Sequence, residues 1–345
     1  MANYLITGGA GFIGSHLCEA LLKEGHHIIN VDSFTDYYSY QSKVKNVLES
    51  LGMAKDFTFT NKADDLQQLQ IKVNREQYRL ELVDIRSMEG LESIFQASKI
   101  DAVIHLAASP GVRASMENPL GFEEVNVKGT LHILELMKKY EVKKWICASS
   151  SSVYGNNTKL PFAETDEVNS PISLYAMTKK SCELMGYAYH HLYGIDTIML
   201  RFFTVFGERQ RPDLAIHKFT ALIDQGVAIP FYGDGSTQRD YTYIKDIING
   251  ISGSLQYIQQ HQDVYQILNL GSNQTYSLTS LVDHISRELG KKPILHKLPM
   301  QPGDVDKTYA DISKAQSLIH YNPLTTFDEG LHAFIAWYEG GRDEW

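Results

Sequence analysis

The first 200 residues alternate short apolar runs with longer amphipathic stretches. The apolar runs predict strands over residues 4–7, 26–32, 79–83, 102–107, 144–149 and 197–203. Between most of them, apolar residues recur at helical spacing and predict helices over 13–23, 87–97, 121–140 and 173–193. Strands that alternate with helices favour an α/β fold, with a parallel sheet covered by helices on both faces.

The pattern becomes irregular after residue 204, where Gly- and Pro-rich turns such as PFYGDGSTQRDY and LPMQPGD interrupt it. We therefore expect a main domain over 1–203 and 238–270, and a smaller, interleaved C-terminal domain over 204–237 and 271–345. Residues 50–78 are polar and charged, and we expect them to form a loop or surface insertion, with an extended surface helix as the alternative.

Composition excludes several classes of protein. Lys and Arg number 32 against 41 Asp and Glu, a net charge of −9, so we expect no nucleic-acid partner and no attraction to an acidic membrane. Cys18, Cys147 and Cys182 lie far apart, which predicts neither a disulfide framework nor a metal site and fits a reducing compartment. No apolar run approaches a membrane span, and the first strand begins almost at Met1, so we expect a cytoplasmic protein.

A glycine-rich turn, TGGAGFIG, lies between the first strand and the first helix. Gly8, Gly11 and Gly14 let the backbone approach a pyrophosphate closely, and the helix N-terminus that follows favours negative charge. A glycine triplet alone is a weak signal, but its place between a strand and a helix is typical of a Rossmann-type, doubly wound sheet that binds a dinucleotide. Phe12 and Ile13 belong to the same expected cofactor site.

Acidic and small residues at later strand ends extend this site. Asp32 ends the second strand, within the ~20 residues expected after the glycines, where a carboxylate accepts hydrogen bonds from ribose hydroxyls. A 2′-phosphate would be repelled there, so NAD is favoured over NADP, although Asp32 could simply cap a turn. Topology adds Asp84, Ile85 and the segment Leu106, Ala107 and Ala108 as residues that flank the adenine and the second ribose.

Tyr175 and Lys179 are four residues apart on a predicted helix, so both project from one face. A neighbouring ammonium favours a phenolate, which could remove a proton from a substrate hydroxyl while hydride leaves the same carbon. The pair alone is a weak signal. The serines that follow the strand over 144–149 strengthen it, because they lie at the sheet edge where α/β proteins place their chemistry, and Ser150 or a neighbour could hydrogen-bond the reacting oxygen.

These segments together resemble the extended short-chain dehydrogenase/reductase family. TGGAGFIG, HLAA, NVKGT, SSSSVYG, YAMTK, LRFFTVFG and YGDGSTQRDYTYIKDI occur in the expected order over nearly the whole chain, and nucleotide-sugar 4-epimerases are the most similar group. The resemblance implies a catalytic Ser150, Tyr175 and Lys179, with Ser152 as an auxiliary hydroxyl and Asn126 near the cofactor. It also implies a bound NAD, a UDP-sugar substrate and a homodimer built on paired helices.

The segment before VYG bears on the reaction. Related dehydratases and decarboxylases carry an acidic residue there, whereas this chain has Ser151 and Ser152, and a hydroxyl is a poor general base. We therefore expect simple epimerisation through a 4-keto sugar, with a dehydratase or decarboxylase as an alternative.

The segment FTVFGERQRPDLAIHKF resembles UDP-glucuronate 4-epimerases, as do DSFTDYYS, SPGVRAS and QPGDVDKTYAD. A C6 carboxylate needs a forked donor, so we expect Arg211 to bind it with Thr204 nearby, unless Arg211 is a surface or diphosphate-binding residue. UDP-glucose and UDP-N-acetylglucosamine 4-epimerases, and a non-catalytic NAD-binding regulator, remain rival predictions. The expected substrate contacts are Ser109, Gly111, Arg113, Ser150, Ser152, Thr204, Arg211, His217, Arg239 and Asp304.

Overall fold

A seven-stranded parallel sheet forms the centre of the molecule. The computed structural model describes residues 1–53, 57–300 and 305–341. In spatial order, the strands are β11 (Tyr265–Leu270), β6 (Asp196–Phe202), β5 (Lys144–Ser150), β4 (Ala102–His105), β1 (Asn3–Thr7), β2 (His27–Val31) and β3 (Tyr78–Glu81). Chain order reverses beside β1, where β2 and β3 lie on one side and β4 on the other, so the sheet has the switch point at which Rossmann-type folds bind ligands. The predicted fold class is confirmed.

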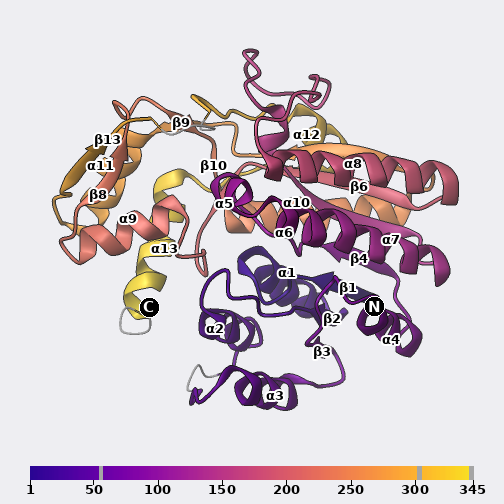
Figure 1. The fold of residues 1–345 in the computed structure, drawn as a ribbon. Coiled ribbons are helices and arrows are strands. Elements are labelled where there is room, and N and C mark those ends of the chain that lie inside the picture. Colours follow the sequence, from indigo (N-terminus) through magenta and orange to yellow (C-terminus); the bar gives the residue numbers. More distant parts are fainter. Residues whose placement is uncertain (54–56, 301–304, 342–345) are drawn as a thin grey trace.

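Helices cover both faces of this sheet (Figure 1). Alternate strand residues face opposite layers: Tyr4 and Ile6 of β1 belong to one apolar core, and Leu5 belongs to the other. The first core includes residues of α1 (Phe12–Lys23), α2 (Tyr40–Ser50), α3 (Lys62–Val73), α10 (Ile244–Gln260) and α12 (Ser313–Ile319). The second includes residues of α4 (Met88–Ala97), α7 (Gly129–Lys139) and α8 (Leu174–Tyr193).

The smaller elements gather beyond the carboxyl edge of the sheet, at left in Figure 1. They are α9 (Ala215–Asp224), β8 (Ile229–Tyr232), α11 (Leu278–Leu289), β13 (Leu295–Leu298) and α13 (Phe327–Gly340). Strands β7 (Thr204–Phe206) and β10 (Tyr241–Tyr243) form a parallel pair, and β9 (Gln238–Arg239) and β12 (Tyr276–Ser277) form an antiparallel pair. The exact division into two domains stays a prediction.

The helix expected over 121–140 is present: α6 (Pro119–Glu123) continues through a π-helical turn at Glu124–Lys128 into α7, and the short helix α5 (Val112–Glu117) precedes it. Within residues 50–78 the structure has the surface helix that the sequence left as the alternative to a loop: α3 packs against α2 and β3. Asn61 caps α3 by accepting a hydrogen bond from the Asp64 backbone N–H at 3.1 Å. The buried apolar stripe of α3 is narrow, since it consists of Leu69 and Val73, and the polar surroundings made a loop the first expectation from the sequence.

This packing predicts a difference between two neighbouring apolar residues of α3. Leu69 is 0% exposed and Ile71 is 81% exposed. Leu69→Ala should lower the free energy of unfolding by about 3 kcal/mol through lost burial and a residual cavity, whereas Ile71→Ala should change it by less than about 0.5 kcal/mol. Urea unfolding followed by circular dichroism measures both values. Equal effects of the two substitutions would contradict the packed position of α3.

Candidate active site

One pocket, with a volume of about 420 Å³, lies along the carboxyl edge of the sheet. This volume falls within the range of small-ligand sites. Residues of the glycine-rich turn line it together with the ends of β2, β4, β5 and β6, the start of α8, and the segment around Arg211. The pocket therefore joins the expected dinucleotide site with the expected catalytic residues.

Most of the residues predicted for the cofactor site line this pocket. They are Gly8, Gly11, Phe12, Ile13, Gly14, Asp32, Asp84, Ile85, Leu106, Ala107, Ala108, Tyr175 and Lys179. Asn126 is not among the lining residues. Its amide accepts a hydrogen bond from the Ser109 backbone N–H at 2.7 Å and donates to Ser109 O and Thr178 Oγ1 at 3.0 Å each. Asn126 therefore holds the backbone of Ser109, a lining residue, in place.

The glycine-rich turn is packed so closely that side chains are excluded at two positions. Gly8 has a φ of +75°, and a Cβ atom there would lie 2.8 Å from the backbone N of Ala107. A Cβ atom at Gly14 would lie 2.2 Å from Gly8 O, so only glycine lets the first turn of α1 pack against the loop. The N-terminus of α1, at Phe12, consequently faces the pocket with its unpaired backbone N–H groups.

Asp32 is fixed at the end of β2. Its carboxylate accepts hydrogen bonds from the backbone N–H groups of Ala10 at 3.1 Å and Phe34 at 2.8 Å. Lys43, which the sequence analysis missed, places its Nζ atom 4.0 Å from Asp32 Oδ1 and donates to Thr35 O at 3.1 Å. Burial lowers the pKa of Lys43. Lys43 could have been identified in the sequence as a charged residue next to Val44 and Val47, on the face of α2 that is buried.

The cavity also carries a polar atom without a partner. The Tyr38 hydroxyl is buried and has no hydrogen-bond partner among the described residues, although Tyr38 lines the pocket. Asp84, which also lines the pocket, accepts two hydrogen bonds of 3.0 and 2.8 Å from Arg86, and these lower the pKa of Asp84. A narrow loop that excludes side chains, a fixed carboxylate and an unpaired hydroxyl fit a dinucleotide with phosphates and ribose hydroxyls.

Ser150, Tyr175 and Lys179 line the pocket together. Ser150 ends β5, where its Oγ accepts a hydrogen bond from the Ser152 backbone N–H at 3.1 Å and lies 3.1 Å from Ser152 Oγ. Lys179 is 5% exposed, and its Nζ donates to Ala148 O at 2.9 Å. Tyr175 lies in the first turn of α8, which Ser173 caps by accepting a hydrogen bond from the Ala176 backbone N–H.

The residues predicted to contact the substrate are only partly brought together. Those that line the pocket are Ser109, Gly111, Ser150, Ser152, Thr204 and Arg211. Arg113 is exposed and lies over the Tyr232 ring, 5.1 Å from its centroid, outside the pocket lining. Arg239 also lies outside the lining and donates to Gln238 O at 2.9 Å. Asp304 lies outside the described residues.

His217 needs a correction, because the structure places it in a packing position. Its Nδ1 atom lies 2.6 Å from Gln210 O, and its ring is enclosed by Phe334, Trp337 and Tyr338. Burial lowers the pKa of His217. His217 is the third residue of α9 and lies on the buried face of that helix. The resemblance of the motif did not indicate this packing role.

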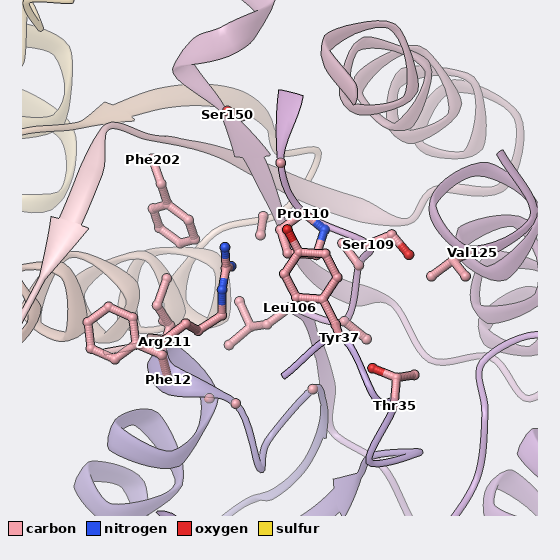
Figure 2. A pocket seen from close by; sticks show the side chains of 18 of the residues that line it. Phe12, Thr35, Tyr37, Leu106, Ser109, Pro110, Val125, Ser150, Phe202 and Arg211 are labelled. Atoms are coloured by element: carbon pink, nitrogen blue, oxygen red, sulfur yellow. The ribbon is translucent and has the colours of Figure 1, made fainter. Parts of the chain in front are cut away.

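Arg211 and Tyr37 lie against each other within the pocket (Figure 2). The Arg211 guanidinium carbon is 5.3 Å from the centroid of the Tyr37 ring. Arg211 also donates two hydrogen bonds of 2.9 Å to the carboxylate of Asp213. Tyr37 follows Asp32 in the DSFTDYYS segment, so this pair connects the two halves of the pocket.

In the described ranges 1–53, 57–300 and 305–341, no helix is long and apolar enough to cross a membrane. The same residues contain no group of three His, Cys, Asp or Glu side chains placed to hold a metal ion. The three cysteines are buried and unpaired with one another.

The arrangement of sheet, glycine-rich turn and Ser–Tyr–Lys group is that of the nucleotide-sugar branch of the short-chain dehydrogenases. A model of the GDP-mannose 4,6 dehydratase family matches residues 5–334, and the chain belongs to this family. A UDP-glucuronate 4-epimerase of Thermodesulfobacterium geofontis is 40% identical over 98% of this chain and 96% of the relative.

Solved structures agree. The UDP-glucuronic acid 4-epimerase of Bacillus cereus, in complex with UDP-glucuronic acid and NAD, has a TM-score of 0.86 and 32% identity over 98% of this chain and 99% of that one. A UDP-N-acetylglucosamine 4-epimerase of Methanobrevibacter ruminantium has a TM-score of 0.81 and 30% identity, covering 98% of each chain. The resemblance inferred from the motifs is confirmed.

Proposed function

We propose that the chain is an NAD-dependent 4-epimerase that interconverts UDP-glucuronate and UDP-galacturonate. The observation that carries this proposal is a single pocket lined by the glycine-rich turn, by Ser150, Tyr175 and Lys179, and by Arg211. The 40% identical relative and the Bacillus cereus structure, both UDP-glucuronate 4-epimerases by name, support the same activity.

NAD fits the cofactor half of the pocket. The N-terminus of α1 and the turn at Gly8–Gly14 would hold the pyrophosphate, and Asp32 with Lys43 would hold the adenosine ribose. A bound NAD supplies a reversible hydride acceptor for C4 of the sugar. The protein's own residues must then transfer the proton of the C4 hydroxyl and allow the sugar to turn, so that either face of C4 can lie against the cofactor.

Tyr175 is the proposed general base and acid. It takes the proton from the C4 hydroxyl as the hydrogen on C4 leaves with the electron pair of the C4–H bond. It returns a proton to the oxygen when hydride adds to the other face of C4. The Lys179 ammonium stabilises the phenolate, and its bond to Ala148 O fixes its position. Ser150 would hydrogen-bond the reacting oxygen. No net oxidation results.

Two features favour epimerisation over the rival predictions, which are a dehydratase or decarboxylase and a non-catalytic NAD-binding protein. Ser151 and Ser152 occupy the positions where a dehydratase or decarboxylase would need a carboxylate, so a second proton transfer has no base there. A non-catalytic NAD-binding protein would not need Tyr175, Lys179 and Ser150 in one pocket with the cofactor cradle.

The sugar is assigned from Arg211 and Thr204. A C6 carboxylate is recognised best by the planar, forked guanidinium, and Arg211 is the arginine that lines the pocket within the described residues. UDP-glucose and UDP-N-acetylglucosamine lack that carboxylate, and they remain the second candidate substrates because the Methanobrevibacter ruminantium relative carries the latter name.

A substrate panel tests the activity. Purified protein incubated with UDP-glucuronate, UDP-glucose or UDP-N-acetylglucosamine should convert only the uronate to its C4 epimer, as read by product NMR. Tyr175→Phe removes the proton carrier while keeping the ring, so kcat should fall at least about 100-fold with NAD still bound. Full activity of that variant, or a dehydrated keto sugar as the product, would contradict the proposal.

Arg211→Ala tests the carboxylate assignment. Losing a charged hydrogen-bonding partner should raise KM for UDP-glucuronate roughly 10- to 100-fold, equivalent to about 1.5–3 kcal/mol. The 4-keto uronate is a β-keto acid, so a loosened carboxylate should also lose CO₂, and reduction of the remaining ketone should give a UDP-pentose. The matched control is Arg75→Ala, because Arg75 is exposed and lies in the segment that precedes β3. An unchanged KM with no pentose would show that Arg211 does not bind the carboxylate.

We also propose that the protein is a homodimer formed through α7 and α8. These helices present Leu131, Leu184, Tyr187 and Leu192 to solvent, an apolar face that a second copy would cover. Light scattering should give twice the chain mass of 39.0 kDa, and Leu184→Glu should give the single chain. Leu324→Glu, at a residue 76% exposed elsewhere, is the control that should leave the mass unchanged. A monomeric wild type would refute this interface.

A further inference from the structure

The forked side of the Arg211 guanidinium is already paired within the chain. Arg211 Nε donates to Asp213 Oδ1 and Nη2 donates to Oδ2, both at 2.9 Å, which is the bidentate geometry of an arginine–carboxylate pair. The Arg211 side chain is 18% exposed and that of Asp213 is 39% exposed. Although burial alone would lower it, this pair raises the pKa of Arg211. A substrate carboxylate must therefore use another side of the guanidinium or displace Asp213.

The other side of the guanidinium is turned into the pocket. Asp213 engages Nε and one proton of Nη2, so the Nη1–Nη2 end can still form a second forked pair. In Figure 2 this end extends toward the part of the pocket where Ser150 and Phe202 lie. Arg211 lines the pocket, whereas Asp213 is not among the lining residues.

Two contacts then fix the Arg211 side chain. Asp213 holds its Nε–Nη2 edge, and the Tyr37 ring covers one face at 5.3 Å. A free arginine side chain has many rotamers, and binding a ligand to it requires that this freedom be lost. An arginine held before the ligand arrives binds with less loss of entropy.

We propose that Asp213 is a positioning residue for uronate recognition: it holds the Arg211 guanidinium so that its Nη1–Nη2 end meets the C6 carboxylate. This inference rests on the proposed function, because it takes UDP-glucuronate as the substrate. Asp213 acts through Arg211 and does not touch the reacting atoms. Its contribution consequently belongs to substrate binding and not to the proton or hydride transfer.

The first experiment is steady-state kinetics of Asp213→Ala with UDP-glucuronate. KM should rise roughly 5- to 20-fold, while kcat stays within about twofold, because the pair is partly exposed and Arg211 keeps its charge. Binding of UDP, which lacks the sugar, should be unchanged by calorimetry. Asp328→Ala is the matched control, since it removes one negative charge from an exposed carboxylate that pairs with His284 away from the pocket lining, and it should leave KM unchanged.

A double-mutant cycle identifies the route of the effect. If Asp213 acts through Arg211, then adding Asp213→Ala to Arg211→Ala should not raise KM further. Asp213→Glu, which keeps the carboxylate on a longer side chain, should recover part of the lost affinity. Thermal unfolding of each variant, followed by circular dichroism, should match the wild type, and Asp213→Asn replaces Asp213→Ala if the alanine variant fails to fold.

Three results would overturn this inference. A lower KM in Asp213→Ala would show that Asp213 competes with the substrate for Arg211, and an unchanged KM would show that the pair does not position it. A further rise of KM in the double variant would show that Asp213 acts independently of Arg211. Wild-type protein that does not epimerise UDP-glucuronate at all would instead refute the proposed function, and this assay is made first.

Discussion

The active-site geometry depends on a buried ion pair between Glu183 on α8 and Arg201 on β6. Both side chains are 1% exposed, and Arg201 donates to Glu183 through Nε at 2.8 Å and Nη2 at 2.9 Å. Ser149 Oγ on β5 donates to the same carboxylate at 2.7 Å. Burial alone would raise the pKa of Glu183, but the Arg201 guanidinium holds it below its usual range. Breaking such a pair leaves an uncompensated charge in the core, so α8 is strongly held in one rotation.

That rotation places the side chains proposed for catalysis. Tyr175, Lys179 and Glu183 are spaced four residues apart and therefore share one face of α8. Glu183 is bound to β5 and β6, and Lys179 Nζ is bound to Ala148 O on β5, so this face is turned toward the sheet at two levels. Tyr175, the residue nearest the N-terminus of the helix, then extends beyond the strand end into the pocket, beside Ser150. The Glu183–Arg201 ion pair thus sets the rotation of α8 that directs Tyr175 into the pocket.

The parts of this site that the sequence predicts are those governed by local rules. Gly14 is required by its close approach to the Gly8 backbone within one turn, and Tyr175 with Lys179 follows from helical spacing, so each is readable from a short segment. Glu183, Arg201 and Lys43 were not identified, because their partners lie on other elements, and the pattern within one helix or strand does not show which side chains pair across elements. The prediction that His217 contacts the substrate failed for the same reason, because its aromatic neighbours come from α13 near the C-terminus.

Arg209 and Arg211 show how position decides the role of one residue type. Arg209, with a φ of +59°, is buried and bridges Glu19 of α1 at 2.7 Å and Glu49 of α2 at 2.9 Å. These contacts attach the loop between β7 and α9 to the cofactor-binding half, where both carboxylates lie on helices of the main sheet. Two residues later the same loop presents Arg211 to the pocket, with its guanidinium paired to Asp213. Because Arg209 holds the loop and Asp213 holds the side chain, Arg211 would need little reorganisation to meet a ligand carboxylate, as the proposed function requires.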